Sequence, residues 1–100
     1  MILKAYHIAR RKNRESILKN GLIPVDKTSG RIQYGPRIFF STDSGNLGFD
    51  YVDFENVDCW EFEVDSNQIS KDPVSNCPYH FYIETAIKPS RLKLNELFSV

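Results

Sequence analysis

The order of apolar and polar residues changes character several times along the chain, and the first segment alternates strictly. In ILKAYHI, one face carries Leu3, Ala5 and His7, and the other carries Ile2, Lys4, Tyr6 and Ile8. A period of two is typical of a β-strand, because successive side chains of a strand point to opposite sides of the sheet. We therefore predict a first strand that has His7 near its end.

The segment that follows, NRESILKNGL, has the signals of a short helix. Asn13 can cap its N-terminus, and Ile17 and Leu18 are predicted to face inward. Gly21 supplies the left-handed residue that commonly ends a helix, and Leu22 is expected to fold back on the helix.

The rest of the chain favours strands separated by polar loops. Residues 24–36 are predicted to form a long loop, 37–41 a strand, and 42–52 a short helix or turn. Alternation predicts further strands in VDCWEFEV and in YHFYIETAI, and RLKLNEL resumes the alternation. The apolar face of YHFYIETAI consists of Phe81, Ile83, Thr85 and Ile87. These elements indicate a strand-rich α+β domain with few, short helices.

Composition narrows the class of protein. At 100 residues, with 41% apolar and 13% aromatic side chains, the chain is long enough for one folded domain, residues 1–100, and too short for a second core. The 13 basic and 13 acidic side chains cancel. The broad positive charge that nucleic-acid binders and membrane-surface proteins use is therefore missing.

Cysteine content and the N-terminal segment bear on the compartment. Cys59 and Cys77 are too few for a disulfide framework, and neither has a second Cys or a His at a metal-ligand spacing. The apolar part of MILKAYHIAR is too short for a signal peptide, and no stretch approaches the roughly 20 apolar residues of a membrane span. We expect a monomeric cytoplasmic protein, in its own cell or in a target cell, with no metal and no membrane partner.

Three features of the sequence carry candidate chemistry. His7 closes the first strand, and Glu84 shares a strand face with His80 and Tyr82. The third feature is YGPRIFFSTDSGNLGFDY, which combines a strand, hydroxyl side chains and several aromatic rings suited to a flat aromatic ligand. Each feature has an ordinary alternative, namely a structural histidine, a solvent-facing carboxylate and aromatic core residues.

The order of these features resembles the ADP-ribosyltransferase superfamily, and more closely its diphtheria-toxin-like H-Y-E branch, which includes the poly(ADP-ribose) polymerases. The matching segments are YHIARRKNRESILKNGLIP, YGPRIFFSTDSGNLGFDY and YIETAIKPSRLKL, which span most of the chain. In that branch a His ends the first strand, a helix ends in IL..GL, a G.GIYF strand precedes a Tyr, and a late strand bears Glu. The resemblance implies a small ADP-ribosyltransferase-like fold, with two packed, mainly antiparallel sheets.

By this resemblance the co-substrate is NAD. Glu84 would be the catalytic carboxylate, His7 would bind the adenosine ribose and the nicotinamide amide, and Tyr51 would stack on the nicotinamide ring. The other implied cofactor contacts are Ile8 through its backbone, Phe39 as a second stacking ring, Arg10 or Arg14 at the pyrophosphate, Ser41, and Phe49. A carboxylate on the ribose 2′-hydroxyl binds more strongly as oxocarbenium-like charge develops in the transition state.

The sequence also departs from the pattern of the family. Ile8 stands where the family commonly has Gly, and Gly48 stands where a Ser that binds the carboxamide is expected. The interval from Phe39 to Tyr51 is one residue longer than in the polymerase-like pattern, so Phe49 is a rival for the stacking role.

Three functions remain open at this point. The first is an NAD-dependent mono-ADP-ribosyltransferase, acting as a toxin, effector or phage-type modifier. Its acceptor is a protein or a nucleic acid, and the zero net charge favours a protein. The second is a catalytically inactive module of the same fold that binds a nucleotide or a partner protein. The third is a relative of the RNA 2′-phosphotransferases, which depend on several Arg residues, for which the sequence offers the cluster Arg10–Arg14.

Overall fold

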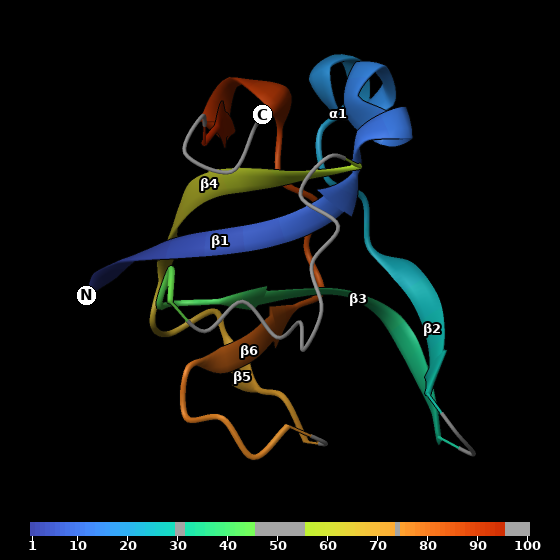
Figure 1. Ribbon diagram of the computed structural model, residues 1–100. Coiled ribbons are helices and arrows are strands. Elements are labelled where there is room, and N and C mark those ends of the chain that lie inside the picture. The colour runs from blue at the N-terminus through green and yellow to red at the C-terminus, as the bar shows by residue number, and fades with distance from the viewer. Residues whose placement is uncertain (30–31, 46–55, 74, 96–100) are drawn as a thin grey trace.

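The computed structural model describes residues 1–29, 32–45, 56–73 and 75–95 (Figure 1). The fold class is α+β, as the sequence predicts. In chain order the elements are β1 (Ile2–Arg10), the 3₁₀ turn η1 (Arg11–Asn13), α1 (Arg14–Asn20), β2 (Val25–Ser29), β3 (Ile32–Ser41), β4 (Val57–Asp65), β5 (Ser70–Lys71), β6 (His80–Ile83), the 3₁₀ turn η2 (Pro89–Arg91) and β7 (Lys93–Leu94). No helix in these four ranges is long and apolar enough to cross a membrane.

The strands form a sheet in the order β5-β6-β3-β1-β4-β7, and β2 pairs with β3 outside this path. All of these pairs are antiparallel. The expectation of two separate packed sheets is not confirmed, because β1 and β3 pair at Tyr6 and Ser41 and so join the strands into one sheet. β1 pairs more extensively with β4, because every residue of β1 has a partner in β4.

The hydrophobic core lies on one face of the sheet. Alternation in β4 places Trp60, Phe62 and Val64 on one face, and all three are buried. Of the two adjacent Phe residues in β3, Phe40 is the core residue, and its ring meets that of Phe62 edge-on at 5.6 Å between centroids. Fully burying a side chain of this size contributes about 1.5–3 kcal/mol.

The helix prediction is confirmed in its position and its end, and it is wrong for the inward side chain of Leu18 and for the cap bond of Asn13. Ile17 is buried, but Leu18 is 59% exposed, because a single short helix turns adjacent positions about 100° apart and only one of them can face the sheet. Asn13 occupies the N-cap position without a side-chain cap bond. Gly21 has φ of 78°, and its N–H donates to the carbonyl of Ile17 at 2.8 Å.

The predicted loop at residues 24–36 is wrong, since most of it forms the strands β2 and β3. Val25 pairs with Arg37 and Ser29 with Ile32, with an irregularity between Val25 and Lys27. Each strand satisfies the backbone groups of the other, so a polar composition does not prevent pairing.

The strand predicted in YHFYIETAI is shorter than expected. β6 ends at Ile83, so Glu84 and Thr85 lie just beyond the strand, and Thr85 is exposed instead of joining the apolar face. Ile83 and Ile87 are buried, as predicted. Most of the helix or turn predicted at residues 42–52 lies outside the described residues.

Candidate functional site

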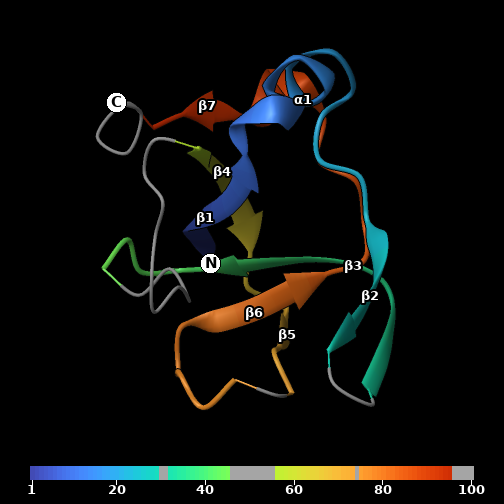
Figure 2. The same cartoon turned by 45° about the vertical axis from the view of Figure 1, so that its right-hand side comes forward.

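β1 and β3 pair at Tyr6 and Ser41 and diverge toward the end of β1 (Figures 1 and 2). His7 is the residue of β1 that follows this pair. Its Nδ1 atom lies 2.5 Å from the carbonyl oxygen of Phe39, and its side chain is half-buried. A carbonyl oxygen only accepts hydrogen bonds, so Nδ1 must be the donor. In the neutral imidazole the second nitrogen, Nε2, is then a hydrogen-bond acceptor.

The side chain of Phe39 lies on the face of β3 opposite to the core residues Ile38 and Phe40. Phe39 is paired with Tyr82 of β6, and the two ring centroids are 5.8 Å apart at an interplanar angle of 52°. The Cζ atom of Arg37 lies 4.1 Å from the centroid of the Tyr82 ring. We refer to Arg37, Phe39 and Tyr82 as the aromatic shelf.

Glu84 follows two residues after Tyr82 and is exposed. The backbone on either side of it is anchored, because Ile83 pairs with Ile38 and Ile87 forms a bridge with Leu22. In Figure 2 the chain that leaves β6 rises beside the segment that joins α1 to β2. These anchors hold the backbone of Glu84 close to the end of the aromatic shelf.

The remaining residues that the sequence suggested for the site differ in their exposure and in their contacts. Ile8 is half-buried in β1 opposite Cys59, and Arg10 is exposed at the end of the strand. Ser41 is buried and uses its hydroxyl in a turn, donating to the carbonyl of Asp43 at 2.9 Å and accepting from the N–H of Asp43 at 3.1 Å. Phe49 and Tyr51 lie outside the described residues. The ring of His7 therefore meets the backbone carbonyl of Phe39, whereas the Phe39 ring lies on the other face of β3 and Ser41 is engaged in a turn.

The basic cluster after β1 forms a buried ion pair. Arg14 donates to both carboxylate oxygens of Asp58, at 2.9 Å from Nε and 2.5 Å from Nη2, and Arg11 Nε donates at 3.3 Å. The Asp58 side chain is fully buried. The hydrogen bond from Arg14 is the main cause that lowers the pKa of Asp58, and the same bond raises the pKa of Arg14.

Asp58 is therefore a buried structural anion, unlike the exposed Glu63 of the same strand. The alternation of β4 contained the signal, because Asp58 falls on the same face as Trp60, Phe62 and Val64. Arg14 is also a poor candidate for the pyrophosphate, since two of its nitrogens already bind a carboxylate.

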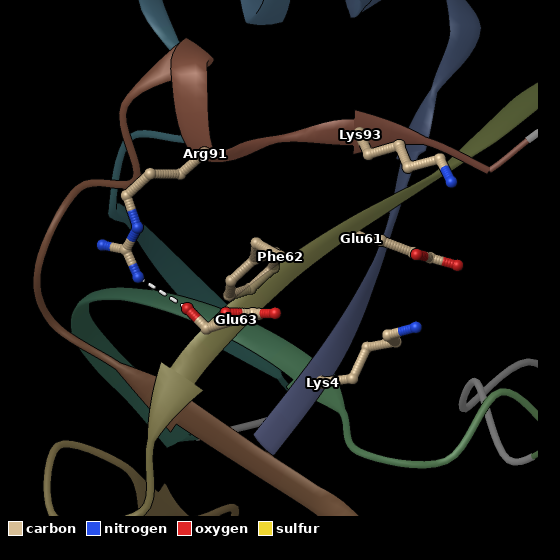
Figure 3. A pocket seen from close by; sticks show the side chains of 6 residues that line it. All are labelled: Lys4, Glu61, Phe62, Glu63, Arg91 and Lys93. Atoms are coloured by element: carbon tan, nitrogen blue, oxygen red, sulfur yellow. Dashed lines mark hydrogen bonds between the residues drawn. The ribbon is translucent and has the colours of Figure 1, made fainter. Parts of the chain in front are cut away.

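A pocket of about 350 Å³ opens on another part of the surface (Figure 3). It is lined by Lys4, Glu61, Phe62, Glu63, Arg91 and Lys93, none of which was a candidate from the sequence. Lys4 lies opposite Glu63 and Lys93 opposite Glu61 on paired strands, and Arg91 Nη2 donates to the backbone carbonyl of Glu63 at 2.5 Å. Opposite charges at facing positions of neighbouring strands are an ordinary feature of the solvent side of a sheet.

The site and the fold together define a class of protein, a small antiparallel α+β domain. Its candidate side chains are His7 on β1, Arg37 and Phe39 on β3, Tyr82 on β6, and Glu84 just after β6. The chain matches no protein-family model, no curated protein and no solved structure among those compared. In the ranges that the structure describes, no group of His, Cys, Asp or Glu side chains could hold a metal ion.

Proposed function

We propose that this protein is an NAD-dependent mono-ADP-ribosyltransferase with the H-Y-E arrangement and an ADP-ribosyltransferase-like fold. The observation that carries the proposal is the adjacency of β1, β3 and β6 in the sheet. β1 contains His7, which the resemblance assigns to the ribose. β3 contains Phe39, which it assigns to stacking. β6 leads to Glu84, which it assigns as the catalytic carboxylate. Distant segments that bring complementary chemistry to one region support a common site.

His7 suits the role of a ribose-binding residue because of its hydrogen bond to Phe39. The bond from Nδ1 fixes the tautomer and the orientation of the ring, as a partner to one imidazole nitrogen generally does. In the neutral ring Nε2 is the acceptor nitrogen, and the proposal assigns the ribose hydroxyl to it. The backbone of β3 thus positions a group that would contact the dinucleotide.

Glu84 suits the role of the catalytic carboxylate. Its side chain makes no hydrogen bond or ion pair within the part of the chain that the structure describes. When the bond between the ribose and nicotinamide breaks, positive charge develops on the ribose, and a carboxylate bound to the 2′-hydroxyl stabilises that charge. The acceptor nucleophile then attacks the ribose carbon that nicotinamide has left.

The test is Glu84→Gln, with Glu15→Gln as a control at another exposed carboxylate. We expect the variant to release nicotinamide from NAD at least about 100-fold more slowly than the wild type, with an NAD affinity that changes by less than about threefold. Glu15→Gln should retain the wild-type rate. An unchanged rate in Glu84→Gln would overturn the assignment of the carboxylate.

A second candidate is a non-catalytic module that binds a nucleotide or a partner protein. The exposure of Glu84 favours it, because catalytic carboxylates usually act in sites from which water is excluded. Calorimetric titration with NAD and ADP-ribose, with nicotinamide release followed in the same samples, separates the two: binding without release supports the module. A phosphotransferase is less well supported, since Arg11 and Arg14 are bound to Asp58.

A further inference from the structure

His80 has no role in the proposed NAD site, because it opens β6 and Glu84 lies beyond the other end of that strand. The Nδ1 atom of His80 lies 2.5 Å from the hydroxyl oxygen of Ser75, which belongs to the loop that joins β5 to β6. A serine hydroxyl within hydrogen-bond reach of an imidazole is the arrangement in which a base activates an oxygen nucleophile.

The second contact of the Ser75 hydroxyl directs its proton. The hydroxyl oxygen accepts a hydrogen bond from the backbone N–H of Cys77 at 3.1 Å. An N–H group only donates, so the hydroxyl keeps its own proton to donate, and Nδ1 of His80 is the acceptor beside it. Nδ1 accepts when the neutral imidazole carries its proton on Nε2. In this tautomer His80 can take up the hydroxyl proton when the oxygen of Ser75 attacks an electrophile.

The backbone around the two side chains is held by several hydrogen bonds. The ammonium group of Lys71 donates to three carbonyl oxygens of the loop and the start of β6, at 3.4, 2.5 and 3.1 Å, namely those of Ser75, Cys77 and His80. The N–H of Ser75 donates to the carboxylate of Asp72 at 3.3 Å, and the N–H of Asp72 donates to the carbonyl of His80 at 3.0 Å. The nucleophile and the base are therefore oriented before a substrate binds.

The position of the pair suits a small molecule that approaches from solvent. Ser75 and His80 are half-buried, and the neighbouring Asn76 and Pro78 are exposed. In Figures 1 and 2 the loop between β5 and β6 lies at the opposite end of the molecule from α1. A hydroxyl nucleophile with an imidazole base is the chemistry of acyl transfer, for which an ester carbonyl is the electrophile.

We propose that Ser75 is a nucleophile that takes up acyl groups from esters of small carboxylic acids, with His80 as its general base. The oxygen of Ser75 attacks the ester carbonyl carbon while the hydroxyl proton passes to Nδ1 of His80. The bond between that carbon and the ester oxygen then breaks, and the leaving alcohol takes the proton from His80. The product is an acyl ester of Ser75, which water hydrolyses to the carboxylic acid and the free serine. This activity uses none of the groups of the proposed NAD site, so each of the two proposals can fail without the other.

The first experiment measures acetylation by p-nitrophenyl acetate. The release of p-nitrophenolate is followed by absorbance, and mass spectrometry of peptides locates the acetyl group. We expect Ser75 to be the serine that is acetylated, and Ser75→Ala to lose this modification. Ser90→Ala, at an exposed serine of η2, is the matched control and should be acetylated at Ser75 like the wild type. Acetylation of the wild type that shows no preference for Ser75 over the other serines would overturn the proposal.

Cys77→Ala removes the neighbouring thiol, which is a rival nucleophile, and keeps the backbone N–H that contacts Ser75. This variant should acetylate Ser75 at the wild-type rate. A loss of the reaction would assign the nucleophile to Cys77 and overturn the role of Ser75.

His80→Asn separates a general base from a structural partner. The carboxamide oxygen of Asn can take the place of Nδ1 as the acceptor of the Ser75 hydroxyl, but it does not take up the proton. We expect this variant to remain folded in circular dichroism and thermal unfolding, and to acetylate Ser75 at least about 100-fold more slowly than the wild type. Equal rates would leave His80 as a structural partner and overturn its role as the base.

Nitrogen chemical shifts of the wild type test the same role without a substitution. Neutral His80 must carry its proton on Nε2 if Nδ1 is to receive the proton of Ser75. A proton on Nδ1 would make His80 the donor of this hydrogen bond and would overturn the proposal.

Discussion

Leu22 and Ile87 exchange two backbone hydrogen bonds, each 2.9 Å long, from the amide of one residue to the carbonyl of the other. The bridge joins the end of α1 to the segment that follows Glu84. The two backbones approach each other so closely at the bridge that a Cβ atom on Gly21 would lie 2.0 Å from the carbonyl oxygen of Ile87. The glycine that ends the helix thus also fixes the segment that bears the proposed catalytic carboxylate.

Gly21→Ala is therefore expected to destabilise the protein by at least about 2 kcal/mol, since it combines a clash with a positive φ. Urea denaturation followed by circular dichroism measures the loss. Gly45→Ala is the control, because a Cβ there meets only Asp43 Oδ2 at 3.5 Å, and we expect a change within about 0.5 kcal/mol. Equal effects of the two substitutions would contradict this account of Gly21.

Asp58→Asn is expected to cost about 2–3 kcal/mol of unfolding free energy, because it removes the buried anion that Arg11 and Arg14 share. The control is Glu63→Gln, an exposed carboxylate on the same strand. The double variant Arg14→Gln with Asp58→Asn should lose less stability than the two single variants together. Strict additivity in urea denaturation would show that the two side chains are not coupled.

Acid should remove the same stabilisation. The pKa of Asp58 is lowered, first by the hydrogen bond from Arg14, so the folded protein binds fewer protons there than the unfolded chain. The contribution is complete above about pH 5 and is lost as the pH falls through the unfolded pKa of about 4 toward the lower folded pKa. The difference in unfolding free energy between the wild type and Asp58→Asn should therefore narrow as the pH falls from about 5 to about 3. A difference that stays constant would contradict the assignment.

The sequence predicted the strands that have one buried, apolar face. It missed a strand that is held mainly by backbone hydrogen bonds to a neighbouring strand. β1 and β4 alternate clearly, and their bounds are close to the predicted ones. β2 was missed because its backbone hydrogen bonds depend on β3, and Gly, Pro and polar residues indicated a loop. β6 ends early because Ile87 pairs with Leu22, a contact between residues far apart in the chain.

In the candidate site, too, the sequence indicated some of the residues but not the contacts that they make. Side-chain patterns singled out His7 and Glu84, but the partner of His7 is the backbone carbonyl of Phe39, which no pattern of side chains reveals. Arg37 was overlooked because its stacking partner, Tyr82, lies on another strand. The inward position of Asp58 was present in the alternation of β4, and its partners became evident only in three dimensions.

The two cysteines should differ in reactivity. Cys59 is fully buried, and its burial, helped by the charge of Glu61, raises its pKa to about 12. At pH 8 only about one thiol in 10⁴ would be ionised even if reagent reached it. Cys77 is half-buried. A disulfide reagent should therefore modify Cys77 alone in the native protein and both thiols in urea, and Cys77→Ser should abolish the native reaction. Rapid labelling of Cys59 in the folded Cys77→Ser variant would contradict its burial.

Two substitutions of His7 should separate its structural role from its proposed binding role. The amide nitrogen of Asn can take the place of Nδ1 and keep the bond to the carbonyl of Phe39, so His7→Asn should retain most of the stability while losing the acceptor at Nε2. His7→Gln places its amide nearer to Nε2 and loses the bond to Phe39, which should cost about 1 kcal/mol.

If Nε2 binds the ribose, His7→Asn should therefore weaken NAD binding about tenfold or more at nearly unchanged stability, as calorimetry and urea denaturation can measure. Nitrogen chemical shifts provide an independent check, since the hydrogen bond to Phe39 requires that neutral His7 carries its proton on Nδ1. A proton on Nε2 would contradict the hydrogen bond. Normal NAD affinity in a stable His7→Asn variant would leave His7 as a structural link between β1 and β3 and remove it from the site.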